Sequence, residues 1–178
     1  GDFGGYFPIR HENNGNIDPK IVFKWLQKQL DTPHINKIFH NATYDLGWLR
    51  HEGIEVKGRI IDTMVAAPLL NENRFSYSLD SERKNEKLLR TAAKNWGIDP
   101  KSEMWKLPAK FVGQYAEQDA AMTLNLWRVF EKELVREELT SIFELETGLI
   151  PLMLDMRQKG VLVDLDKAEQ TKKLLQQS

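Results

Sequence analysis

The first 70 residues alternate between helical patterns and short apolar segments, and this alternation limits the fold more than any other feature. A helix is predicted to begin at Asp18-Pro19, because aspartate caps a helix N-terminus and proline suits the first helical turn. Apolar segments at 36–40 and 54–61 are predicted to be strands, and a helical pattern follows each of them. Strands that alternate with helices in this way indicate an α/β sandwich.

The rest of the chain is predicted to be mainly helical. Residues 5–10 are expected to be the end of a strand, whereas 73–95 is a polar helical segment with mixed charges. Its basic side chains fit a solvated helix face, which we favour, or a patch that faces DNA. Pro108 is expected to open a long helix, and further helical stretches cover 139–156 and 165–177.

Charge and composition exclude several classes of protein. The 178 residues contain 25 Lys and Arg and 26 Asp and Glu, so bulk positive charge does not hold a nucleic acid here. Cysteine is absent, which excludes disulfides, thiolate zinc sites and cysteine nucleophiles. The longest run without a polar residue, 64–70, is too short to cross a bilayer. We expect no membrane partner.

Two segments carry residue types that can do chemistry. The first, 40–49, places Asp45 just after a predicted buried strand, and ligands bind at such strand ends in open α/β folds. The second contains Tyr115, Asp119 and Thr123, which share one face of the predicted long helix. Tyr115 and Asp119 are then about 6 Å apart along the helix axis.

Each of these acidic residues also has a purely structural interpretation. Asp45 can be a cap for the helix that follows it, and the Tyr–Asp–Thr face can be a half-polar packing surface. For Asp62, which precedes another predicted helix, we favour the cap. Glu117 and Gln118 lie on other faces of the long helix and are expected to be solvated.

Together, these segments resemble motifs of a known nuclease family. Asn-x-x-Tyr-Asp-Leu-x-Trp-Leu, which begins at Asn41, resembles the second motif of the DnaQ-like (DEDD) 3′–5′ exonucleases. Tyr-Ala-Glu-Gln-Asp-Ala-x-x-Thr, which begins at Tyr115, resembles the third motif of their tyrosine-containing subclass. Segments 61–70 and 77–81 look like the linking segments of the family, and 146–164 resembles the junction into the polymerase region of a family A DNA polymerase.

The resemblance implies a role for each matching residue. Asp45 and Asp119 would be ligands of two divalent metal ions, either Mg²⁺ or Mn²⁺. Tyr115 would orient the attacking water, and Asn41 and Tyr44 would contact the single-stranded 3′ end of the DNA. The implied fold is an RNase H-like 3′–5′ exonuclease fold, an α/β architecture in which helices flank a mixed sheet.

The sequence departs from the family at its start. The Asp-x-Glu of the first motif is not found upstream of the segment 5–11, and Asp2-Phe3-Gly4 does not match it. We expect an N-terminally truncated domain whose first strand lies outside this sequence, although loss of the strand in the lineage is the alternative. With two of four metal-binding carboxylates absent, the chain alone is expected to bind metal poorly and to show little nuclease activity. The missing strand would also expose a sheet edge through which the chain could self-associate.

These observations lead to one favoured interpretation and two alternatives. Residues 1–143 are predicted to be a proofreading exonuclease domain, and 144–178 to be the first helices of the polymerase region. The expected partners are DNA, as a single-stranded 3′ end or primer-template, and the rest of a polymerase chain. We expect a cytoplasmic location in a bacterial cell or phage-infected host. The alternatives are a non-catalytic scaffold or DNA-binding module with the same fold, and an RNase-D-like exonuclease that acts on RNA.

Overall fold

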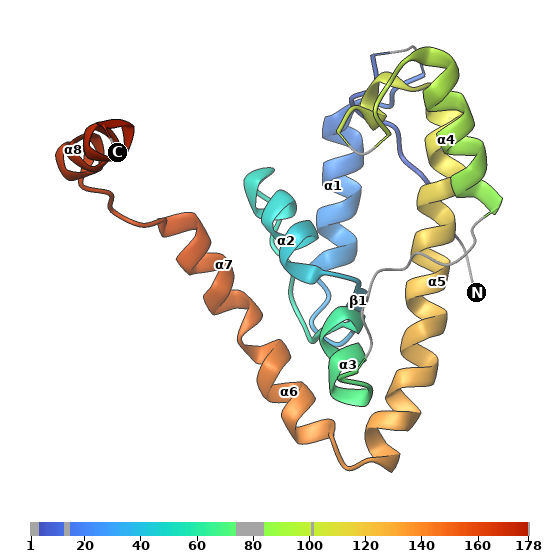
Figure 1. The fold of residues 1–178 in the computed structure, drawn as a ribbon. Coiled ribbons are helices and arrows are strands. Elements are labelled where there is room, and N and C mark those ends of the chain that lie inside the picture. Colours follow the sequence, from blue (N-terminus) through green and yellow to red (C-terminus); the bar gives the residue numbers. More distant parts are fainter. Residues whose placement is uncertain (1–3, 13–14, 74–83, 101, 178) are drawn as a thin grey trace.

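The computed structural model describes residues 4–12, 15–73, 84–100 and 102–177 (Figure 1). In chain order, the elements are α1 (Pro19–Leu30), β1 (Lys37–Phe39), α2 (Ala42–His51), β2 (Ile60–Asp62), α3 (Thr63–Leu70), α4 (Lys84–Trp96), the 3-10 helix η1 (Met104–Lys106), α5 (Ala109–Arg136), α6 (Thr140–Gly148), α7 (Ile150–Lys159) and α8 (Leu165–Gln177). The predicted alternation of helices and strands is therefore confirmed.

β1 and β2 form a small parallel sheet. Lys37 pairs with Ile60 and Phe39 with Asp62, so both strands end at the same level. The helices α2, α3 and α5 pack against β1, while α6 packs against β2. The α/β class is confirmed, but the expected mixed sheet is smaller here, because the described residues contain only these two parallel strands.

Two segments that are predicted to be strands are mostly irregular chain in the structure. Residues 5–10 form no strand; they run along the surface of α5 as irregular chain. In 54–61 only the last two residues join β2, because the segment before them bonds to α1 rather than to a neighbouring strand. Apolar residues alone could not distinguish these two situations.

The main core joins the sheet to the C-terminal helices. Ile61 of β2, Ala66 of α3, Trp127 of α5 and Phe143 of α6 are buried together. The rings of Trp127 and Phe143 are stacked, with their centroids 5.3 Å apart and an interplanar angle of 27°. Truncation of a buried aromatic ring costs about 3–5 kcal/mol, so this pair anchors α6 firmly to α5.

A second core lies between α4 and α5 and includes the N-terminal segment. Leu107 and Val112 are buried against Leu89 and its neighbours on α4. Tyr6 packs on the backbone of α5 at Gly113, where an added Cβ would lie 3.1 Å from the tyrosine ring.

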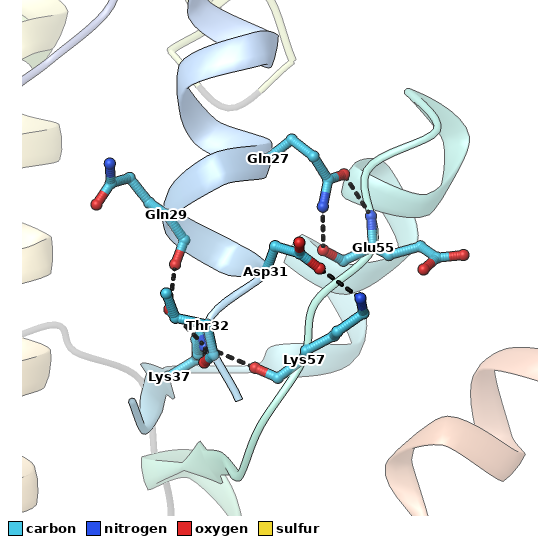
Figure 2. Close-up of polar contacts among 7 residues, drawn as sticks. All are labelled: Gln27, Gln29, Asp31, Thr32, Lys37, Glu55 and Lys57. Carbon is cyan, nitrogen blue, oxygen red and sulfur yellow. Dashed lines mark hydrogen bonds and ion pairs between the residues drawn. The ribbon is translucent and has the colours of Figure 1, made fainter. Parts of the chain in front are cut away.

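The path of α1 into β1 and of α2 into β2 is fixed by polar contacts (Figure 2). The side-chain amide of Gln27 donates to the carbonyl of Glu55 (3.1 Å) and accepts from its N–H (3.0 Å), as a neighbouring strand would. The buried ammonium of Lys37 donates to the carbonyl of Lys57 (2.6 Å) and to the carbonyl of Thr32. These bonds hold the segments that lead into β1 and β2 next to each other.

The C-terminal helices lead away from the end of α5 (Figure 1). α7 packs against α2 through Leu154 and Ile150, which are buried with Ala42 and Leu46. α8 lies apart, and the side chains of 165–176 are exposed. The predicted boundary at 143/144 would lie inside α6, and the division into two domains remains a prediction. None of the helices that the structure describes is long and apolar enough to cross a membrane.

Candidate active site at the ends of β1 and β2

Asp45 lies in the first turn of α2, directly beyond the end of β1. The turn between strand and helix is tight, because Asn41 adopts a left-handed conformation with φ 70° and ψ 57°. Asparagine tolerates this region better than most residues. The predicted position of Asp45, at a strand end and a helix start, is therefore confirmed.

Asp62 ties the two strand ends together. Its carboxylate accepts hydrogen bonds from the backbone N–H groups of Asn41 (2.9 Å), Ala42 (2.8 Å) and Met64 (2.8 Å). One buried side chain thus caps α2 and α3 at the same time. The cap interpretation of Asp62 is confirmed for α3, and its second role at α2 could not be predicted from local sequence.

A buried hydroxyl reinforces this junction. Thr63 donates from Oγ1 to the carbonyl of Phe39 (3.1 Å) and lies 2.9 Å from Nδ1 of His40. These bonds connect the end of β1 to the start of α3. The backbone around Asp45 is therefore held by two independent sets of contacts.

The charge of Asp45 is destabilised by its surroundings. Burial raises the pKa of its carboxyl from 3.8 to about 6, and the negative charge of Asp62 adds to the increase. A backbone hydrogen bond at Asp45 lowers the pKa but is the smaller effect. A positive charge close to this carboxyl would stabilise its ionised form.

The predicted DNA contacts Asn41 and Tyr44 are both exposed beside Asp45. Tyr44 has 57% of its surface accessible and meets Trp48 edge-on, with ring centroids 6.5 Å apart. The Asn41 side chain accepts from the hydroxyl of Thr43 (3.0 Å). Neither residue is used in the apolar core, so both are available to a ligand.

Tyr115 and Asp119 lie on α5, and both are half-buried. Tyr115 packs against the edge of the second core, beside α4. The charge interaction between Asp45 and Asp62 places these two carboxyls next to each other. No group of three or more His, Cys, Asp or Glu side chains that could hold a metal ion is found in the described part of the chain.

Glu117 and Gln118 differ in their exposure to solvent. Glu117 is exposed, as predicted. Gln118 is partly buried, and its Oε1 is fully buried without a hydrogen-bond partner among the described residues, so the prediction that it is solvated is wrong. Gln118 follows Tyr115 by three residues, so helical spacing places it near the Tyr–Asp face, and the spacing alone does not show what packs there.

Comparison with known proteins agrees with the resemblance found in the motifs. A family model for a 3′–5′ exonuclease matches residues 5–135. A DNA-directed DNA polymerase of Pseudomonas phage M6 is 41% identical over 175 residues, which cover 93% of this chain and 26% of that polymerase. DNA polymerase I of Synechocystis sp. is 29% identical over 164 residues, covering 90% of this chain and 17% of that protein.

The chain therefore spans about a quarter or less of the length of these relatives. A solved structure described as Brucella melitensis NrnC with bound Mg²⁺ has a similar fold, with a TM-score of 0.56 and 22% identity. The match covers 79% of this chain and 67% of that one. By its sequence, the chain belongs to the 3′–5′ exonuclease domain family of family A DNA polymerases.

Proposed function

We propose that this chain forms the proofreading part of a family A DNA polymerase and hydrolyses the terminal phosphodiester of a single-stranded 3′ end. One observation supports this most: Asp45 lies at the strand-to-helix turn with its pKa raised to about 6, so its environment favours a nearby cation. The exonuclease family model and the polymerase relatives, from both phage and bacteria, support the same activity.

Each residue has a role that its position allows. Asn41 and Tyr44 would hold the terminal nucleotide, since both are exposed next to Asp45. Tyr115 would orient the attacking water from α5. Asp45 and Asp119 would be the carboxylate ligands that this chain contributes.

The described residues do not complete a metal site, because they contain no cluster of three or more ligands. We therefore propose that the site needs further carboxylates, such as an Asp-x-Glu pair, to bind two Mg²⁺ or Mn²⁺ ions. Bound divalent ions would supply a hydroxide at neutral pH and stabilise the leaving oxygen.

The test is a nuclease assay on the intact protein that carries this sequence. A labelled single-stranded DNA is incubated with Mg²⁺ or Mn²⁺, and wild type is compared with Asp119→Ala. Asp166→Ala, a change on the exposed helix α8, is the matched control. Stepwise shortening from the 3′ end that Asp119→Ala abolishes and Asp166→Ala retains would support the proposal.

The same assay separates the two alternatives. Absence of cleavage by the wild-type protein would favour the non-catalytic scaffold. Faster cleavage of an RNA of the same sequence would favour the RNase-D-like alternative. An Asp-x-Glu strand fused to the chain is expected to restore activity if the isolated chain lacks it.

We also propose that the chain self-associates through β1. Among the described residues β1 pairs only with β2, which leaves its second edge without a strand partner. Unpaired edges invite pairing with another chain. Light scattering at increasing concentration tests this, and a monomer throughout would contradict it. We propose a location in the cytoplasm of a bacterial cell or phage-infected host, which fractionation of cells would test.

A further inference from the structure

A cleft of about 500 Å³ lies between α2 and α7, beside the candidate active site. It is lined by side chains of both helices, chiefly Tyr44, Trp48, His51, Leu154, Arg157 and Gln158. The two helices are adjacent in Figure 1, and their buried contact includes Leu46 and Leu154. Tyr44 belongs to both the cleft and the surroundings of Asp45.

Three rings form a row along one wall of this cleft. Tyr44, Trp48 and His51 are spaced i, i+4 and i+7, which places them on one face of α2. The rings meet edge-to-face, at 6.5 Å for Tyr44–Trp48 and 5.9 Å for Trp48–His51. Trp48 is 55% exposed, although a ring of this size is usually buried more. The row therefore offers aromatic surface that the core does not use.

The opposite wall, formed by α7, carries the positive charge of Arg157. The other arginine at the cleft, Arg50 of α2, pairs with Asp155 of α7 at 2.5 Å, so its charge is partly neutralised. Arg157 has no ion pair among the described residues, and none of the residues that line the cleft is acidic. Aromatic rings facing an arginine without a carboxylate partner complement a ligand that has flat bases and negative phosphates.

We propose that this cleft binds single-stranded DNA next to the 3′-terminal nucleotide, with a base stacked on Trp48 and a phosphate paired with Arg157. The inference rests on the proposed function, which places the terminal nucleotide at Asn41 and Tyr44. Stacking on an aromatic ring tolerates any base, which suits a site that receives any sequence. The strand would run from Tyr44 along α2 toward His51.

The experiment measures binding without cleavage. A fluorescently labelled oligothymidylate is titrated with the intact protein in EDTA, and the dissociation constant is read from anisotropy at several salt concentrations. The variants are Trp48→Ala and Arg157→Gln. The matched controls are Trp96→Ala, whose ring on α4 is 52% exposed, and Arg136→Gln, at the far end of α5.

We expect Trp48→Ala to weaken binding about five- to tenfold, the low end of what stacking of one base contributes, without a change in salt dependence. Arg157→Gln should weaken binding and reduce the slope of log K against log salt by about 0.7, the effect of one lost phosphate contact on a single strand. Trp96→Ala and Arg136→Gln should bind as wild type does.

Other outcomes would overturn the inference. If Trp48→Ala binds like Trp96→Ala while the wild-type protein cleaves DNA in Mg²⁺, the cleft is not a subsite but the proposed function stands. If the wild-type protein neither binds nor cleaves, the proposed function fails as well. If Trp48→Ala lowers the free energy of unfolding without weakening DNA binding, the Trp48 ring is structural and the inference is wrong.

Discussion

Burial and the neighbouring charge of Asp62 raise the pKa of Asp45, whereas the carboxylate of Asp62 itself accepts hydrogen bonds from three backbone N–H groups. Asp62 is the last residue of β2 and Asp45 lies in the helix that follows β1, and the two strands end side by side in the parallel sheet. Asp62 therefore has a structural role, whereas the charged form of Asp45 lies in an unfavourable environment. Unfavourable charges of this kind concentrate at functional sites, where a ligand relieves them.

Asp45→Asn is expected to stabilise the chain at neutral pH. The carboxyl has a pKa of about 6 in the folded state and 3.8 as its ordinary value, so the folded state binds the proton more tightly. Stability is therefore lost as the pH rises from about 4 to 6, and the loss is constant above that range. We expect Asp45→Asn to raise the free energy of unfolding by about 1–2 kcal/mol at pH 7 and by little at pH 4. The value at pH 7 is reduced to allow for the partial exposure of Asp45 to solvent.

Urea denaturation at pH 4, 5, 6 and 7 measures this difference. Asp166→Asn, on the exposed helix α8, is the control and should follow wild type at every pH. A gain of equal size at pH 4 and pH 7 would show that the charge of Asp45 is not its cause.

Asp62→Ala is expected to destabilise the chain by about 3–5 kcal/mol, because three backbone N–H groups lose a charged acceptor at once. Asp18→Ala is the matched control, since Asp18 caps only α1 through one bond to Lys20 (2.9 Å). Asp18→Ala should lower the free energy of unfolding by about 1 kcal/mol. Equal losses for the two variants, measured by thermal or urea unfolding, would contradict the double cap.

Gly113→Ala is expected to destabilise the chain by about 1 kcal/mol, although alanine favours helices by a similar amount. The new Cβ would lie 3.1 Å from Cδ1 of Tyr6, whose hydroxyl is held by His11 at 2.5 Å. Gly148→Ala, in α6, meets no atom within 4 Å and should be neutral or stabilising. If Tyr6→Leu does not reduce the cost of Gly113→Ala in the double variant, the steric explanation is wrong.

Lys37→Met is expected to cost about 2–3 kcal/mol, because it leaves the carbonyls of Thr32 and Lys57 without their buried donor (Figure 2). Lys57→Met removes an ion pair to Asp31 in which both side chains are about half exposed and screened by solvent, so it should lower the free energy of unfolding much less than Lys37→Met. A larger loss for Lys57→Met in urea unfolding would reverse this order of importance.

The local features of the fold could be predicted from the sequence. Asp18-Pro19 marks the start of α1, and Asp62-Thr63 marks the start of α3, because caps and proline act within one turn of the chain. The position of Asp45 and the shared face of Tyr115 and Asp119 follow in the same way, from spacing on a single element.

Contacts between distant segments could not be predicted, because they depend on which surfaces meet after packing. The sequence by itself determined the alternation of helices and strands, the helix starts and the exonuclease motifs. Only the tertiary structure decided that Asp62 caps α2 as well as α3, that Gln118 is partly buried, and that Trp48 and Arg157 line the same cleft. Propensities and caps act over a few neighbouring residues, whereas burial, charge coupling and clefts arise between segments that packing brings together.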